Sequence, residues 1–121
     1  DKVESILTAH PDIDIIWAAN EGGTVGAVGA VRNAHKSGKV VVFGTDMSEQ
    51  LGDFLLSDDN VLQAVTGQKP FDIGSMSVEM AIKAVKGETI GKKVSLPGVL
   101  FTREKQDEVK AYKTRLQELS K

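Results

Sequence analysis

The sequence alternates short apolar runs with stretches of helical periodicity. Residues 13–19, 40–45 and 61–67 are apolar runs with the length and composition of buried strands. Residues 23–37 and 48–56 lie between them and have the pattern of helices. Because strands and helices alternate over such short connections, we predict an α/β fold: a three-layer arrangement with a mostly parallel sheet and helices on both faces.

The same alternation continues in the second half of the chain. We expect a long helix from about residue 71 to 86, followed by an extended segment over residues 93–102. Pro97 has no N–H to donate to a neighbouring strand, so this last strand should be an edge strand or a kinked one. Residues 103–121 have an apolar stripe among charges and predict an amphipathic terminal helix capped by Thr102.

Two packing expectations follow from small and large residues in these elements. The small residues of the first inter-strand helix should let it lie close on the sheet; they are Gly26, Ala27, Gly29 and Ala30. Trp17 lies within an apolar strand and is expected in the core.

Length and composition exclude several classes of function. A chain of 121 residues forms one domain, and 15 basic against 17 acidic residues give a net charge of −2, so we expect no nucleic-acid partner. The absence of cysteine excludes disulfides and thiol catalysis. No apolar stretch reaches the roughly 20 residues of a membrane helix. Since the chain begins without methionine inside an expected helix, we expect it to be a piece or a processed product of a longer protein.

Each of the three apolar runs finishes on a hydrogen-bonding side chain: Asn20, Asp46 and Gln68. The carboxyl ends of neighbouring parallel strands are where α/β folds place their ligands. Asn20 and Asp46 also suit helix capping, whereas Gln68 precedes Lys69-Pro70 and is a poor cap. Two amides and a carboxylate provide fixed donors and acceptors, so we predict a binding site for a polyhydroxylated small molecule.

Catalytic, metal and cofactor sites have little support in the sequence. The glycines of residues 20–30 do not match a dinucleotide-binding fingerprint, and only Asp46 follows a strand as an acidic ribose ligand would. His10 and His35 fall at helix ends away from the polar strand ends, and no serine lies in a nucleophile elbow. We therefore expect no enzyme, no catalytic residue, no metal ligand and no cofactor.

Four segments resemble the periplasmic sugar-binding proteins of the ribose and galactose type, a fold shared by the effector domains of lactose-repressor-like regulators. Residues 20–27, Asn-Glu-x-x-Thr-Val-Gly-Ala, resemble the family's Asn-Asp-x-x-Ala-x-Gly-Ala block. Residues 41–46 resemble its hydrophobic strand running into Gly-x-Asp, and residues 68–70 its hinge-crossing block. Residues 99–104 resemble its terminal strand and Val-Thr-Arg-Glu ending.

The resemblance implies how the chain is divided. By this resemblance, residues 1–70 are a ligand-binding βαβαβ segment of the carboxy-terminal lobe. Residues 71–102 are a hinge-crossing helix and strand, and residues 103–121 are the terminal helix. Such proteins close two lobes on a ligand, so the amino-terminal lobe and the first part of the carboxy-terminal lobe are missing here. Since a sheet cut in this way exposes strand edges, we expect a homo-oligomer or packing on a complementary fragment.

The resemblance also implies a function. In the family, the positions matching Asn20, Asp46 and Gln68 hydrogen-bond sugar hydroxyls between the lobes. The chain is therefore expected to be part of the solute-binding component of an ABC-type sugar importer, with a monosaccharide or related polyol as ligand and a membrane permease as partner. Its location would be the periplasm or, as a lipoprotein, the outer side of the membrane. The alternatives are the effector domain of a transcription regulator and an α/β nucleotide-dependent enzyme.

Overall fold

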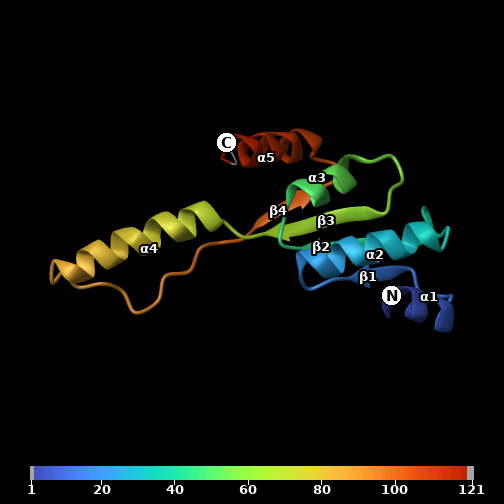
Figure 1. Ribbon diagram of the computed structural model, residues 1–121, viewed down its shortest axis with the longest axis horizontal. Helices are drawn as coiled ribbons and strands as arrows, with labels where there is room; N and C mark the ends of the chain where they lie inside the picture. Colours follow the sequence, from blue (N-terminus) through green and yellow to red (C-terminus); the bar gives the residue numbers. More distant parts are fainter. Residues whose placement is uncertain (1, 120–121) are drawn as a thin grey trace. The chain divides into compact units, whose positions relative to one another are not determined.

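The computed structural model describes residues 2–119 and shows, within them, five helices and four strands in alternation (Figure 1). The helices are α1 (Lys2–Ala9), α2 (Glu21–Asn33), α3 (Glu49–Leu56), α4 (Pro70–Val85) and α5 (Gln106–Leu119). The strands are β1 (Ile15–Trp17), β2 (Val41–Thr45), β3 (Leu62–Gly67) and β4 (Val99–Thr102). The predicted α/β class with a mostly parallel sheet is confirmed.

The four strands form one sheet in the order β1-β2-β3-β4. β1 pairs with β2 and β2 with β3, both parallel, with α2 and α3 as the crossover connections. The amide of Arg103, just after β4, donates to the carbonyl of Gln63 at the start of β3. The end of β4 therefore lies beside the start of β3, so β4 runs antiparallel. It is an edge strand, as predicted from Pro97.

Contacts divide the chain into two compact units. The first unit runs from the amino terminus to Gly67 and resumes at Leu100, so it contains all helices except α4. The second unit is Gln68–Val99 and consists of α4 and the extended segment that follows it.

One face of the sheet carries the core of the first unit. In β2 the buried positions alternate with less buried ones, as in a strand covered on one side. In β3, where the register with β2 shifts after Leu62, residues 62, 65 and 67 are the buried ones. The fully buried side chains come from these strands and from the helices beside them; they include Val28, Val31, Val42, Leu51, Leu55, Leu62, Val65 and Val109. Each large apolar side chain buried in this way contributes about 1.5–3 kcal/mol to stability. This core fixes the carboxyl ends of the parallel strands in place.

The expectation that Trp17 is a core residue is wrong. Its side chain is 67% exposed, and Ile15, on the same side of β1, is also exposed. β1 is the other edge strand and has only three paired residues. An apolar run read from the sequence does not show whether both faces of the strand are covered, which is why the prediction failed.

The packing of α2 on the sheet differs in part from the prediction. Ala27 and Ala30 are buried, as expected, but a Cβ atom added at Gly29 would meet no atom within 4 Å. The close approach is instead at Gly44 in β2, where an added Cβ would lie 2.3 Å from the Cγ2 atom of Thr24. The glycine that permits close packing is therefore on the strand.

Two helix boundaries also differ from the prediction. α2 ends at Asn33, four residues before the predicted end, and His35 follows with a φ of 53°. The terminal helix begins at Gln106, and Thr102 is the last residue of β4, so Thr102 does not cap it. The last two residues of the expected terminal helix, 120 and 121, lie outside the described part of the chain.

The second unit has no core of its own among the described residues. α4 begins with Pro70, which suits the first turn because its missing N–H needs no partner there. It ends before Gly87, whose φ of 75° breaks the helix, as predicted. No residue of α4 is buried, and Val78, Ile82 and Val85 are exposed.

Candidate functional site

Asn20 lies between β1 and α2 and is the N-cap of the helix. Its backbone is extended, and its Oδ1 atom accepts a hydrogen bond from the amide of Gly23 at 2.7 Å. Asparagine is one of the preferred residues at this position because its oxygen pairs with an amide that the helix leaves unpaired. The capping role considered from the sequence is thus confirmed. The side chain is exposed, and the structure describes no partner for its Nδ2 amide group.

Asp46 is the first residue after β2. Its backbone has a φ of 68°, in the left-handed region that few residues other than glycine adopt, although aspartate tolerates it better than most. Its amide donates to the carbonyl of Thr66 at 2.8 Å, so β3 fixes the turn. Ser48, and not Asp46, caps the next helix, because its Oγ atom accepts a hydrogen bond from the Leu51 amide. The helix after β2 therefore does not explain the carboxylate of Asp46.

The sheet register places Asn20 and Asp46 at the same end of the sheet, beyond the carboxyl ends of β1 and β2. Trp17 of β1 is paired with Phe43 of β2, and each candidate residue lies three positions further along its own strand direction. The hydrogen bond from the Ala18 amide to the Phe43 carbonyl, at 2.9 Å, extends the pairing one residue toward this edge. Asn20 and Asp46 thus follow adjacent parallel strands at their carboxyl ends, as predicted.

Two hydroxyl groups near this edge were missed by the sequence analysis. Thr45 and Thr66 are register partners at the ends of β2 and β3, and their Oγ1 atoms lie 3.5 Å apart. Both side chains are at least partly exposed. Threonine is common in strands, so only the pairing of β2 with β3 distinguishes these two from other strand residues.

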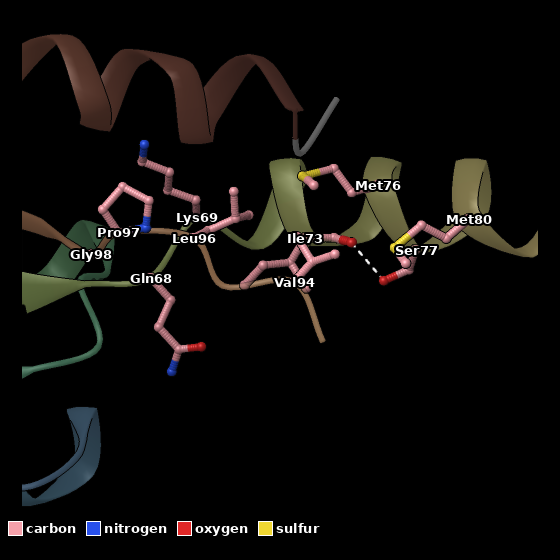
Figure 2. Close-up of a pocket in the computed structure, with 10 residues that line it drawn as sticks. All are labelled: Gln68, Lys69, Ile73, Met76, Ser77, Met80, Val94, Leu96, Pro97 and Gly98. Atoms are coloured by element: carbon pink, nitrogen blue, oxygen red, sulfur yellow. Dashed lines mark hydrogen bonds between the residues drawn. The ribbon is translucent and has the colours of Figure 1, made fainter. Parts of the chain in front are cut away.

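Gln68 belongs to the second unit, of which it is the first residue. There it borders a cavity of about 490 Å³ whose lining is mainly apolar and includes Ile73, Met76, Met80 and Leu96 (Figure 2). Figure 2 shows the Gln68 side chain extending away from α4. The structure therefore brings together Asn20 and Asp46 within one unit, while the role of Gln68 stays a prediction.

The cavity of the second unit has a different chemistry from the strand ends. Its lining hydroxyl, Oγ of Ser77, donates to the carbonyl of Ile73 at 2.7 Å and so is satisfied within α4. Because the remaining lining is dominated by aliphatic and methionine side chains, this cavity suits apolar groups better than a polyhydroxylated ligand.

A partly buried network of ion pairs lies just before the start of β3, away from the carboxyl ends of the parallel strands. Asp59 receives hydrogen bonds from Arg32 Nε at 2.5 Å, Ser57 Oγ at 2.8 Å and the Val61 amide at 3.2 Å. Burial acts to raise the pKa of Asp59, but these hydrogen bonds together lower the pKa below its ordinary value. Arg103 lies 3.7 Å from the same carboxylate and donates to backbone carbonyls. This network is structural.

The strand-end residues provide hydrogen-bond donors and acceptors. Among residues 2–119 no group of histidine or acidic side chains is arranged to bind a metal ion. None of the helices in this part of the chain is long and apolar enough to cross a membrane. The carboxylate of Asp46 can accept hydrogen bonds and the amide of Asn20 can donate them, which is the chemistry of hydroxyl recognition.

Comparisons with known proteins point to one family. Residues 1–89 match the model of the periplasmic binding protein domain. The ribose import binding protein RbsB of Escherichia coli (strain K12) is 37% identical over 91 residues, which cover 75% of this chain and 30% of that protein. The D-allose-binding periplasmic protein of the same organism is 33% identical over 86 residues, which cover 71% and 27%.

Solved structures agree with this assignment. An ABC transporter periplasmic solute binding protein from Actinobacillus succinogenes 130z, with bound D-allose, has a TM-score of 0.82 and 30% identity, covering 88% of this chain and 37% of that one. A solute binding protein from Agrobacterium vitis, with bound allitol, has a TM-score of 0.83 at 22% identity, covering 92% and 39%, and shows the fold alone. The chain spans about a third of the length of the proteins it matches. It belongs to the periplasmic binding protein domain family.

Proposed function

We propose that this chain is part of the solute-binding component of an ABC-type sugar importer, and that Asn20, Asp46 and Gln68 hydrogen-bond the hydroxyl groups of a monosaccharide or polyol. The observation that carries the proposal is the placement of Asn20 and Asp46 three residues beyond a paired position of two adjacent parallel strands. The names of the relatives, which bind ribose and D-allose, support the ligand class.

The two residues of the first unit have complementary roles in this proposal. The Asp46 carboxylate accepts hydrogen bonds from two hydroxyl groups, and bonds to a charged acceptor are stronger than neutral ones. The Asn20 Oδ1 atom is occupied by the Gly23 amide, so its Nδ2 group donates to a hydroxyl oxygen. The turn at Asp46 is fixed before a ligand arrives, which lowers the entropy cost of binding.

A thermal-shift screen of the full-length protein, with both lobes, against pentoses, hexoses, polyols and nucleotides tests the proposal. We expect one sugar to stabilise the protein, by about 2.7 kcal/mol at a concentration one hundred times Kd. The Asp46→Ala variant should lose this shift. Asp58→Ala is the matched control, because Asp58 is exposed and lies before β3, away from the carboxyl ends of the strands.

Asn20→Asp separates the capping role of Asn20 from its binding role. Aspartate caps a helix as well as asparagine does but has no N–H to donate. We expect this variant to keep the unliganded melting temperature and to lose sugar affinity, while Asn20→Ala loses both. Stabilisation by nucleotides only, or a sugar shift unchanged in Asp46→Ala, would contradict the proposal.

The importer assignment carries three further expectations. The protein binds its ligand without transforming it, acts outside the cytoplasmic membrane, in the periplasm or as a lipoprotein, and delivers the sugar to a membrane permease. We also propose that the exposed apolar residues of both units, such as Trp17 and Val85, are covered by a second copy or by a complementary segment. Family membership and the names of the relatives support the three expectations that follow from the importer assignment.

A further inference from the structure

Thr24 is a fully buried polar residue in the first turn and a half of α2. Its exposed fraction is 0%, and among the described residues it is the one polar side chain of the buried set. A buried hydroxyl group is costly unless it forms hydrogen bonds, so its partners show what the position requires.

The Thr24 hydroxyl group connects the two strand ends that carry Asn20 and Asp46. Its Oγ1 atom donates to the carbonyl of Asn20 at 2.7 Å. The same atom accepts a hydrogen bond from the amide of Thr45, the residue directly before Asp46, at 3.4 Å. One oxygen atom therefore bridges the backbone after β1 and the backbone at the end of β2.

This bridge lies where the sheet no longer joins the two strands. Trp17 and Phe43 are the last register pair of β1 and β2, and the Ala18 amide forms the last described hydrogen bond between them. Thr45 lies two residues beyond Phe43. The Thr24 hydroxyl group thus connects the two strand ends beyond the last backbone hydrogen bond between β1 and β2, next to the candidate site.

The methyl group of Thr24 fixes the same geometry by contact. It lies over Gly44, where an added Cβ would be 2.3 Å from Cγ2 and 2.6 Å from Oγ1 of Thr24. The side chain therefore has little freedom to rotate, which keeps the hydroxyl group directed at its two partners.

We infer that Thr24 is a positioning residue, which sets the placement of Asp46 relative to Asn20 by bridging their strand ends. This inference rests on the proposed sugar-binding function for its consequence, but the bridge itself is a property of the unliganded chain. Since Thr24 is fully buried, it does not touch the ligand and acts through the backbone of Asn20 and of Thr45, the residue before Asp46.

Two substitutions separate the hydroxyl group from the shape of the side chain. Thr24→Val keeps the methyl group over Gly44 and removes the hydrogen bonds, while Thr24→Ser keeps the hydroxyl group. Val28→Ala is the control for a merely structural role, because Val28 is fully buried in the same helix and is apolar. All variants are compared by NMR, as amide shifts and hydrogen exchange without ligand, and by sugar titration well below the melting temperature.

We expect Thr24→Val to speed amide exchange at Thr45, to shift the amide signals of Asn20 and Asp46, and to weaken sugar binding about tenfold, as loss of outer hydrogen-bonding partners does in metal sites. Thr24→Ser should restore both properties. Val28→Ala should lower the melting temperature and leave the three amide signals and the affinity unchanged.

The outcomes distinguish this inference from the proposed function. Unchanged amide signals in Thr24→Val, or equal changes in Val28→Ala, would overturn the positioning role whatever the sugar titration gives. If the amide signals change as expected but the full-length protein, with both lobes, binds no sugar, the bridge is supported and the proposed function is overturned.

Discussion

At the carboxyl ends of the parallel strands, single residues have a structural role beside the binding role that we propose for them. Asn20 caps α2 through Oδ1 and leaves its amide nitrogen for a ligand. Asp46 occupies a left-handed backbone conformation that its neighbour Thr66 fixes by a hydrogen bond. The capping role of Asn20 and its proposed binding role are therefore compatible, because they use different atoms of the side chain.

Gly44 of β2 and Gly29 of α2 should respond in opposite ways to substitution by alanine. Gly44→Ala places a methyl group 2.3 Å from Thr24 and should lower the free energy of unfolding by about 1–3 kcal/mol, the usual cost of overpacking. Gly29→Ala adds a methyl group within α2 where no atom lies within 4 Å, and should raise it by about 0.5–1 kcal/mol. Urea denaturation of both variants measures the difference.

The Gly44 prediction has an internal control. Thr24→Ala removes the two nearest atoms, Cγ2 and Oγ1, and leaves Cβ at 3.0 Å, so the double variant should recover much of the stability that Gly44→Ala alone loses. Equal destabilisation by the two glycine substitutions would show that the contact of Thr24 with Gly44 is not what requires glycine at position 44.

The sequence predicted the candidate residues of the first unit better than their neighbours. Asn20 and Asp46 were found because each follows an apolar run, and parallel strands bring such positions to one edge. Trp17 was misplaced because burial depends on what covers a strand face, which its own residues do not record. The role of Thr24 depends on a contact across 21 residues and has no local signal.

At the level of elements, the network around Asp59 joins segments that are far apart in the sequence. Arg32 comes from α2 and stacks its guanidinium group over the Phe54 ring of α3, 4.4 Å from the centroid. Arg103, after β4, donates to the carbonyls of Phe54, Ser57 and Leu62. The carboxylate of Asp59 forms ion pairs with both guanidinium groups and offsets part of their positive charge.

The stability of the chain should depend on pH through Asp59. Because the pKa of Asp59 is lowered in the folded protein, its ionised form stabilises the fold above the unfolded pKa of about 3.9. This contribution is lost as the pH falls below that value and through the lower folded pKa. Asp59→Asn should lower the free energy of unfolding at pH 7 by about 1–2 kcal/mol, and the difference from the unmodified chain should shrink toward pH 3.

The pH dependence has a matched control next to it in the sequence. Asp58 is exposed and the structure describes no hydrogen bond for its side chain, so Asp58→Asn should leave the difference near zero at every pH. A gap between Asp59→Asn and the unmodified chain that stays constant from pH 7 to pH 3 would contradict the assignment. Chemical denaturation at several pH values provides the measurement.

Element boundaries were predictable where a local signal was present. The helix predicted from residue 48 starts where Ser48, a residue type preferred as a cap, accepts the hydrogen bond of the first turn, and Gly87 follows α4 with a positive φ. α2 ends at Asn33, and His35 just after it has a positive φ that is not helical. This end was not predicted because no glycine or proline lies at that point of the sequence. The start of α5 was placed too early because Thr102 remains part of β4.

At the level of the whole molecule, the two units differ in how much they bury. The first unit has a core of leucine and valine side chains that several elements share. The second unit, as far as the structure describes it, has no buried residue in α4 and several exposed aliphatic side chains. An ordered helix that buries none of its apolar residues has little to offset its loss of conformational entropy.

We therefore expect the isolated chain to associate, and its single tryptophan reports the association. At low concentration Trp17 should show the red-shifted, readily quenched fluorescence of an exposed indole. As the concentration rises, a blue shift should accompany an increase in mass by light scattering if the sheet face at β1 is covered. The variant Val85→Lys places a charge on the exposed apolar residues of α4 and should reduce the association seen by light scattering if α4 takes part in it. A monodisperse monomer of the unmodified chain at micromolar concentration would contradict the expectation.

The contact of Thr24 with Gly44 restricts the order in which these two positions can change during evolution. If position 24 becomes alanine first, the sheet acquires a small void and room for a side chain at position 44. If position 44 changes first, the new methyl group meets Thr24 at once. Descendants of this sequence should therefore reach a larger residue at position 44 only through an ancestor that had already lost threonine at position 24.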